Sequence, residues 1–286
     1  MLSTVPRAAG VETPGAVGLP PPGRTATFLR ARFACTDEEV LRAERKLLPN
    51  QVHPGIDPAR PGNTCDSLQS RLSLSEPELK KVVLGLPSVL SCSYEANIAP
   101  SLAALQSRLS LSEPELKKVV LRLPQVLGYS YEANIAPSLA ALQSRLSLSE
   151  LELKKVVLGL PPVLSYSYEA NIAPTLAFME TAFHLAPDEL GERVVAIPPL
   201  LGYSLEVRYH PRVTLVSALG VVVTQQTLTP AAMYTDAKFM AWLRKREQLG
   251  LTDEEWAALC FLPLVERGGG IPPVFTCIPA CVSPWP

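Results

Sequence analysis

The chain lacks several features that mark common protein classes. Aromatic residues make up 6% of its 286 residues, its six cysteines are too few for a disulfide scaffold, and no apolar run is long enough to cross a membrane. Neither sign of charge dominates, since 26 Lys and Arg stand against 27 Asp and Glu. This balance excludes a strongly basic nucleic-acid tail and a highly charged disordered chain. With 47% apolar residues, the chain can form a large core in one or two domains.

Proline is abundant, and its positions follow a repeat. Among the 29 prolines, steps of 37 residues join Pro87, Pro124, Pro161 and Pro198. The windows 76–112 and 113–149 differ only at the pairs Gly85/Arg122, Ser88/Gln125, Ser91/Gly128 and Cys92/Tyr129. Later windows drift, and a degenerate earlier copy is expected to begin at Thr36. Atypical end copies are typical of stacked repeat arrays, whose terminal units cover the core.

Each repeat predicts two short helices separated by a proline turn. A Ser-x-x-Glu capping box at Ser75 predicts the start of the first helix, and Pro87 predicts its end. A tight or 3₁₀ turn is expected at 87–91. The second helix is expected to start at Ser93 and to have a kink or a late start at Pro100. The apolar stripes of the two helices are Leu79, Val82, Val83 and Leu86, then Ile98, Leu102, Leu105 and Leu109.

Neither helix of a repeat can bury its stripe alone, whereas stacked repeats bury both stripes in a shared core. The sequence therefore predicts an all-α, superhelical α-solenoid of stacked helix–Pro turn–helix repeats, about 37 residues each. No segment shows sustained strand alternation, although residues 213–224 are ambiguous.

The predicted domains are a flexible segment 1–35, a repeat array 36–246, a C-terminal helix within 247–266 and a Pro/Gly-rich, disordered tail 267–286. The first segment holds four Arg and one Glu, which suits an organelle transit peptide.

The sequence shows no catalytic or metal-binding arrangement. His53, His184 and His210 have no metal-ligand partner at helical spacing, and no zincin, nucleophile-elbow or phosphate-loop motif occurs. Cys277 and Cys281 lie in the Pro-rich tail without a histidine beside them, so a zinc site is not expected. The sequence therefore predicts a protein that is not an enzyme and needs no cofactor and no metal.

Three stretches carry a family resemblance. The repeat at 109–142 contains LPQVLGYS and EANIAP, residues 202–213 read GYSLEVRYHPRV, and residues 235–243 read TDAKFMAWL. Together they resemble the repeat, the YSLE-x-R-x-x-PR segment and the C-terminal helix of the mitochondrial transcription termination factor (mTERF) family. The resemblance runs from about Thr36 to Arg246, and the Pro, Tyr-Ser and Asn positions recur in phase.

This resemblance implies a superhelical monomer that binds organelle DNA or RNA, including double-stranded DNA, in a mitochondrion or chloroplast. It implies transcription regulation through termination, transcript processing or ribosome assembly, with proteins of the expression machinery as further partners and no membrane. The family usually presents a basic surface, whereas residues 68–204 hold 11 Lys and Arg against 13 Asp and Glu. A protein-interaction scaffold without nucleic-acid binding is therefore the alternative.

Basic residues recur once per repeat and are the candidate phosphate contacts. Equivalent positions of a solenoid stack into rows, and a row of like charge can follow a phosphate backbone. The candidate nucleic-acid-binding residues are Lys80, Lys81, Lys117, Lys118, Lys154, Lys155, Arg71, Arg108, Arg145, Arg208 and Arg212. The alternative for each lysine pair is a solvated face, where Glu76 pairs with Lys80 and Glu78 with Lys81 on the same helix.

The character of the concave face separates these interpretations. A concave face on which Lys80 and its equivalents have no acidic partner would favour nucleic acid, whereas an acidic or apolar face would favour the scaffold.

Tyr94 and its equivalents either stack on bases or pack between repeats, and we expect packing. Asn97 and its equivalents either contact base edges or bond to the local backbone, and we expect the local bond.

Overall fold

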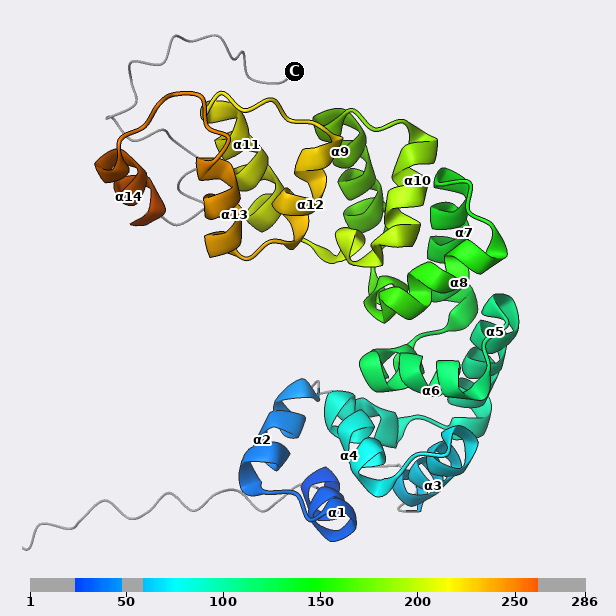
Figure 1. Ribbon diagram of the computed structural model, residues 1–286. Coiled ribbons are helices and arrows are strands. Elements are labelled where there is room, and N and C mark those ends of the chain that lie inside the picture. The colour runs from blue at the N-terminus through cyan, green and yellow to red at the C-terminus, as the bar shows by residue number, and fades with distance from the viewer. Residues whose placement is uncertain (1–23, 48–58, 262–286) are drawn as a thin grey trace, which may run out of the picture.

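The computed structural model describes residues 24–47 and 59–261, which form a crescent of helices in an inner and an outer layer (Figure 1). The α-helices are α1 (Arg24–Phe33), α2 (Asp37–Lys46), α3 (Arg60–Leu72), α4 (Glu76–Gly85), α5 (Ala99–Leu109), α6 (Glu113–Arg122), α7 (Ala136–Arg145), α8 (Glu150–Gly159), α9 (Ala173–Phe183), α10 (Pro187–Ala196), α11 (His210–Ala218), α12 (Gln225–Met233), α13 (Asp236–Arg244) and α14 (Asp253–Phe261). No strand occurs in these described ranges, and residues 213–224 form the end of α11 and a loop. The predicted all-α solenoid is confirmed.

Two short segments connect the inner and outer α-helices of each repeat. Five-residue 3₁₀ turns follow the inner helices at Pro87–Ser91, Pro124–Gly128, Pro161–Ser165 and Pro198–Gly202, as predicted. π-Helical turns then lead into the outer helices at Tyr94–Ile98, Tyr131–Ile135, Tyr168–Ile172 and Leu205–Tyr209. Pro100 consequently lies in the first turn of α5, where a missing N–H costs little. The late start at this proline is confirmed, although the π-helical turn was not predicted.

Capping boxes begin the inner helices. The backbone N–H of Ser75 donates to Glu78 Oε2 at 2.8 Å, and that of Ser112 donates to Glu115 Oε2 at 2.8 Å. Four of the outer helices are followed by a residue with positive φ, at the C-cap or one residue after it. These residues are Ser73, Ser110, Ser147 and His184. This left-handed conformation stops the helix and directs the chain into the next capping box.

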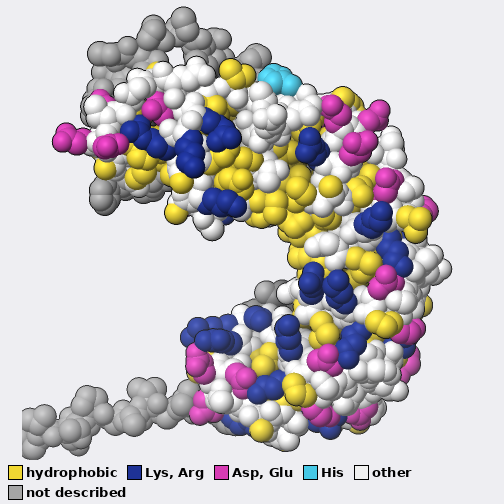
Figure 2. All heavy atoms as spheres, viewed as in Figure 1, with side chains coloured by type: hydrophobic (Ala, Val, Ile, Leu, Met, Phe, Trp, Pro, Cys, Tyr) yellow, Lys and Arg dark blue, Asp and Glu magenta, His cyan; other side chains and the backbone are white. Residues whose placement is uncertain are grey.

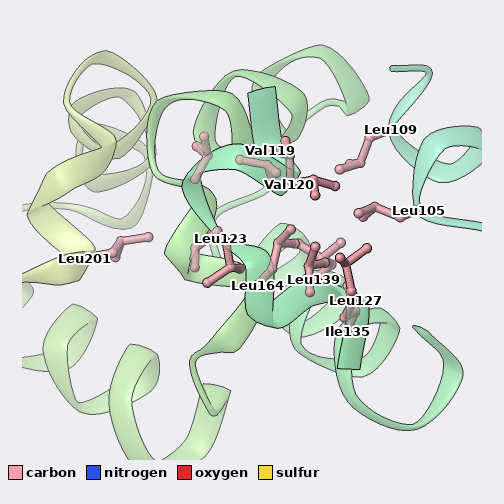
Figure 3. Packing of buried hydrophobic residues seen from close by; sticks show 14 of the residues in the cluster. Leu105, Leu109, Val119, Val120, Leu123, Leu127, Ile135, Leu139, Leu164 and Leu201 are labelled. Carbon is pink, nitrogen blue, oxygen red and sulfur yellow. The ribbon is translucent and has the colours of Figure 1, made fainter. Parts of the chain in front are cut away.

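One hydrophobic cluster runs through the array. Leu79, Val82 and Val83 of α4 are completely buried, as are their equivalents in α6 and α8. Figure 3 shows such side chains from successive helices, including Leu109 and Val120, in the space between them. Because α4 contacts α6, α6 contacts α8 and α8 contacts α10, the cluster is continuous. Each buried Leu or Val contributes about 1.5–3 kcal/mol, so this shared core accounts for the stacking.

The array begins before the predicted boundary at residue 35. α1 buries Ala26, Leu29 and Phe33, one face of a helix, and contacts α2. The predicted flexible segment is therefore corrected for residues 24–35, because this apolar face outweighs their Arg-bearing composition. Residues 1–23 and the tail 267–286 lie outside the described residues, so the transit peptide and the disordered tail stay predictions. α14 lies where a C-terminal helix was predicted.

Candidate nucleic-acid interface

The inner helices α4, α6 and α8 line the hollow of the crescent (Figure 1). Since their buried residues pack into the core, the opposite face of each helix is turned toward the hollow. In α6 this exposed face carries Pro114, Lys118 and Arg122, spaced four residues apart. Figure 2 shows Lys and Arg side chains along the N-terminal part of the hollow and a hydrophobic area along its C-terminal part, whereas Asp and Glu lie mainly toward the outer edge. The N-terminal part of the hollow is therefore the more basic side of the crescent.

The first lysine of each pair binds the preceding repeat. Lys117 Nζ lies 2.8 Å from a carboxylate oxygen of Glu78 and donates to the Ser73 carbonyl at 2.9 Å. The equivalent ion pairs are Lys80 with Glu39 at 2.9 Å and Lys154 with Glu115 at 2.8 Å. In the alternative interpretation Lys80 pairs with Glu76 of its own helix, whereas in the structure it pairs with Glu39 of the preceding repeat. We call these three ion pairs the Lys–Glu ladder.

Each glutamate of the Lys–Glu ladder also belongs to a capping box. The carboxylate of Glu78 accepts from the N–H of Ser75 and binds Lys117 of the next repeat with the same oxygen. The hydrogen bond from Lys117 lowers the pKa of Glu78 to about 2, and Lys154 lowers the pKa of Glu115 to about 2 in the same way. Both carboxylates are therefore ionised throughout the neutral range, and one group starts a helix and joins two repeats.

We expect the thermal stability of the protein to fall as the pH drops from about 4.5 toward about 2. Unfolded glutamates titrate near pH 4.3, whereas Glu78 and Glu115 titrate near pH 2 when folded. In this window the unfolded state binds more protons, so acid removes a stabilisation that is fully present above about pH 5. Melting temperatures measured from pH 7 to pH 2 test this. A Lys117→Met/Lys154→Met variant should melt lower at pH 7 and show a shallower acid decrease, and an equal decrease would contradict the assignment.

The arginines near the ends of the outer helices also bind between repeats. Arg71 forms an ion pair with Glu113 of α6 and donates to the side chain of Gln106 at 2.6 Å. The equivalent contacts are Arg108 with Glu150 and Gln143, and Arg145 with Glu180 at 2.5 Å. These three candidate residues therefore have acidic partners within the protein.

Two further candidates hold the C-terminal helices together. Arg212 is 1% exposed, binds Asp236 at 2.5 Å and donates to the carbonyl oxygen of Ala231 at 2.9 Å. Arg208 is half-buried and donates to the carbonyl oxygen of Ala232 at 2.7 Å. The two side chains thereby fix α12 and α13 against the end of the array. A phosphate reaches Arg212 only if these helices rearrange.

The second lysine of each pair, unlike the first, forms no ion pair with the preceding repeat. Lys81, Lys118 and Lys155 are exposed and form no ion pair among the described residues. We call these three residues the free lysine row. The criterion set on Lys80 and its equivalents is not met, since those lysines have acidic partners, but the adjacent row is unpaired. Arg122 lies on the same face of α6, is exposed and was not among the candidates, although its difference from Gly85 was visible in the sequence.

Both lysine rows end at α10. Gly191 and Glu192 occupy the positions equivalent to Lys154 and Lys155. A Cβ on Gly191 would lie 2.9 Å from the carbonyl oxygen of Leu146, so the backbone of α10 approaches α7 too closely for a side chain at this position. The rows are therefore confined to α4, α6 and α8.

A model of the mTERF family matches residues 40–240, which is most of the chain. The chain belongs to the mTERF family. This match covers the Lys–Glu ladder except Glu39, and it covers the free lysine row, Arg208 and Arg212. mTERF proteins are helical-repeat, nucleic-acid-binding proteins of organelles and are not typically enzymes. No curated protein is similar enough in sequence to count as a match.

The repeated tyrosines and asparagines of this mTERF chain have structural surroundings. Tyr94, Tyr131 and Tyr168 pack partly buried against the core, which confirms the packing interpretation. Burial raises the pKa of Tyr94 and of Tyr131. The side chain of Asn171 accepts a hydrogen bond from the backbone N–H of Ser167 at 3.1 Å, which is the local bond expected.

The described ranges hold neither a metal-binding cluster nor a membrane-spanning helix. Within residues 24–47 and 59–261 no group of three or more His, Cys, Asp or Glu is placed to hold a metal ion. In this described part of the mTERF array, no helix combines the length and apolar character needed to cross a bilayer. His53, Cys277 and Cys281 lie outside the described residues.

Proposed function

We propose that this mTERF protein binds DNA or RNA in a mitochondrion or chloroplast and regulates gene expression there through transcription termination or transcript processing. The observation that carries the proposal is the free lysine row, one unpaired cation per repeat on the hollow side of the crescent. Lysine–phosphate contacts release counterions and supply affinity that does not depend on sequence. Fit to the shape of the nucleic acid adds selectivity.

A near-neutral array is compatible with this mechanism because its charges are segregated. Carboxylates of the array, such as Glu78 and Glu113, are held by Lys117 and Arg71 in ion pairs between repeats. These pairs contribute little net field at the surface. The free lysine row forms no ion pair among the described residues, and only Lys155 has a carboxylate, that of Glu152, near enough to interact with it. The hollow therefore attracts phosphate although the sum of charges is close to zero.

The test is a salt titration of binding by the full-length protein. Labelled duplex DNA and single-stranded RNA are titrated at several salt concentrations, with fluorescence anisotropy as the readout. If Lys81, Lys118, Lys155 and Arg122 each contact one phosphate of duplex DNA, log K should fall against log salt with a slope of about −3.6. Undetectable binding to both nucleic acids at about 20 mM salt, where such contacts are strongest, would contradict the proposal. A tagged full-length chain found outside mitochondria and chloroplasts would contradict its compartment.

The alternative function is a protein-interaction scaffold without nucleic-acid binding. It is favoured by exposed apolar side chains on the C-terminal arm, where Val207 is 63% and Met233 41% exposed. Figure 2 shows a hydrophobic area on the inward side of this arm. Such areas mark interaction surfaces. A partner captured by the wild type after nuclease treatment, but not by a Met233→Glu variant, would support this alternative if nucleic-acid binding is absent.

A further inference from the structure

A second, smaller hollow lies between two neighbouring repeats and is lined by the unpaired residues Lys81, Lys118 and Arg122. In this subsection, 'the hollow' means this smaller one. It has a volume of about 310 Å³ and lies between α4 and α6. Its lining residues are Lys81, Pro114, Lys117, Lys118, Leu121 and Arg122. No acidic side chain is among them, and the two apolar residues supply part of the wall. The hollow is therefore lined by positive charge from both α4 and α6.

The charge of the hollow is not balanced within the protein. Lys117 is held by Glu78, but Lys81, Lys118 and Arg122 form no ion pair among the described residues. Lys118 and Arg122 lie four residues apart on one helix, an arrangement of like charges that destabilises the helix. Folding alone gives no reason for three unpaired cations at one place, whereas a bound anion would compensate them.

Arg122 makes this hollow different from its neighbours. The equivalent positions in α4 and α8 are Gly85 and Gly159. A Cβ there would lie 2.7 Å from the Cγ of Pro124 or of Pro198. Only α6, among the three near-identical inner helices, carries a side chain at this position, and the difference is the only charged one between the windows 76–112 and 113–149.

We propose that the hollow between α4 and α6 is a phosphate-binding site, in which the guanidinium of Arg122 binds two phosphate oxygens and Lys81 and Lys118 bind the same or an adjoining phosphate. Guanidinium groups bind phosphate in this bidentate way, and flanking ammonium groups add point charges. The proposal rests on the proposed function, because the phosphate is assigned to a nucleic-acid backbone. Arg122 then fixes the register of the nucleic acid on the central repeat, while the other repeats contact it through lysine alone.

The first experiment compares full-length Arg122→Gly with the wild type in the salt titration. This variant gives α6 the glycine that α4 and α8 already have, so it should fold and melt like the wild type. We expect binding to duplex DNA to weaken about fivefold at 0.15 M salt and the slope to decrease by about one. Arg122→Lys should restore the slope but only part of the affinity, since it keeps the charge without the fork.

A matched control separates the loss of this site from the loss of one positive charge elsewhere on the protein. Arg60 at the start of the outer helix α3 forms no ion pair among the described residues, so Arg60→Gln removes the same charge outside the hollow. If Arg122→Gly and Arg60→Gln weaken binding equally, the phosphate site is overturned while nucleic-acid binding by the wild type still stands.

A second arm distinguishes a backbone phosphate from a free polyphosphate. Inorganic pyrophosphate is titrated into both proteins by calorimetry. Weak pyrophosphate binding that Arg122→Gly abolishes, together with the loss in DNA affinity, supports a site for backbone phosphate. If the wild type binds no nucleic acid at all, the proposed function fails; Arg122-dependent pyrophosphate binding would then keep a phosphate site, and its absence would overturn that as well.

Discussion

Replacing Lys81, Lys118 and Lys155 together with glutamine should weaken binding to duplex DNA by on the order of 100-fold at 0.15 M salt. Each unpaired lysine is expected to contact one phosphate, and losing three such contacts should reduce the slope of log K against log salt by about 2.7. The three side chains are exposed and lie apart from the core and the ion pairs between repeats. The melting temperature should therefore remain that of the wild type, and anisotropy titrations with circular dichroism measure both quantities.

The matched control changes the neighbouring residues. Lys80→Gln/Lys117→Gln/Lys154→Gln removes the same number of charges one position earlier in each helix, but from the Lys–Glu ladder. We expect this variant to melt at a lower temperature and, measured where it is folded, to retain the salt slope of the wild type. Equal losses of slope in the two triple variants would show that the free lysine row is not the phosphate contact.

Replacing Arg212 with methionine should lower the free energy of unfolding by about 3 kcal/mol, because hydrogen bonds from a buried charged group are lost. The guanidinium is 1% exposed and donates to the carbonyl oxygen of Ala231, which would lose its donor in a buried place. It also binds Asp236, so its removal takes away the ion pair between α11 and α13 and leaves them joined by apolar contacts. The C-terminal helices should unfold first, because they have only a small cluster of their own around Phe239.

Urea unfolding followed by circular dichroism measures this effect. Asp236→Asn is the informative comparison, because an amide oxygen still accepts from Arg212 and the side chain of Asp236 is 68% exposed. The Asp236→Asn change should lower the free energy of unfolding by only about 1 kcal/mol. An Arg212→Met protein that unfolds at the same urea concentration as the wild type would contradict the structural role and reopen a direct contact with phosphate.

Local features of the repeat were predictable because they depend on neighbouring residues. The capping box at Ser75, the 3₁₀ turn after Pro87 and the late helix start at Pro100 follow from hydrogen-bonding and steric rules within a few residues. The 37-residue period added the stacking, since only repeated stripes share a core. The start of the array is harder to predict, because the Arg-bearing composition of residues 24–35 favours a flexible segment while the spacing of Ala26, Leu29 and Phe33 favours a helix.

Contacts between repeats could not be predicted from spacing along one helix. Glu78 lies within four residues of two lysines, Lys80 and Lys81, yet it caps its own helix and binds Lys117, which is 39 positions away. That choice depends on how neighbouring repeats are offset, which no local rule specifies. For the same reason Arg212 was expected at a phosphate, although it is buried against α13. The sequence located the basic positions, and only the structure separated the paired from the unpaired ones.

The end of the lysine rows at Gly191 and Glu192 has a consequence for the span of nucleic acid that the protein contacts. Three consecutive inner helices present an unpaired lysine, and the fourth presents a carboxylate at the equivalent place. If the free lysine row contacts phosphates as proposed, repulsion by that carboxylate limits the contacted segment on one side, and the footprint is expected to grow in steps of one repeat. A tandem duplication of one 37-residue unit would lengthen the protected segment by a fixed increment, and a deletion would shorten it equally.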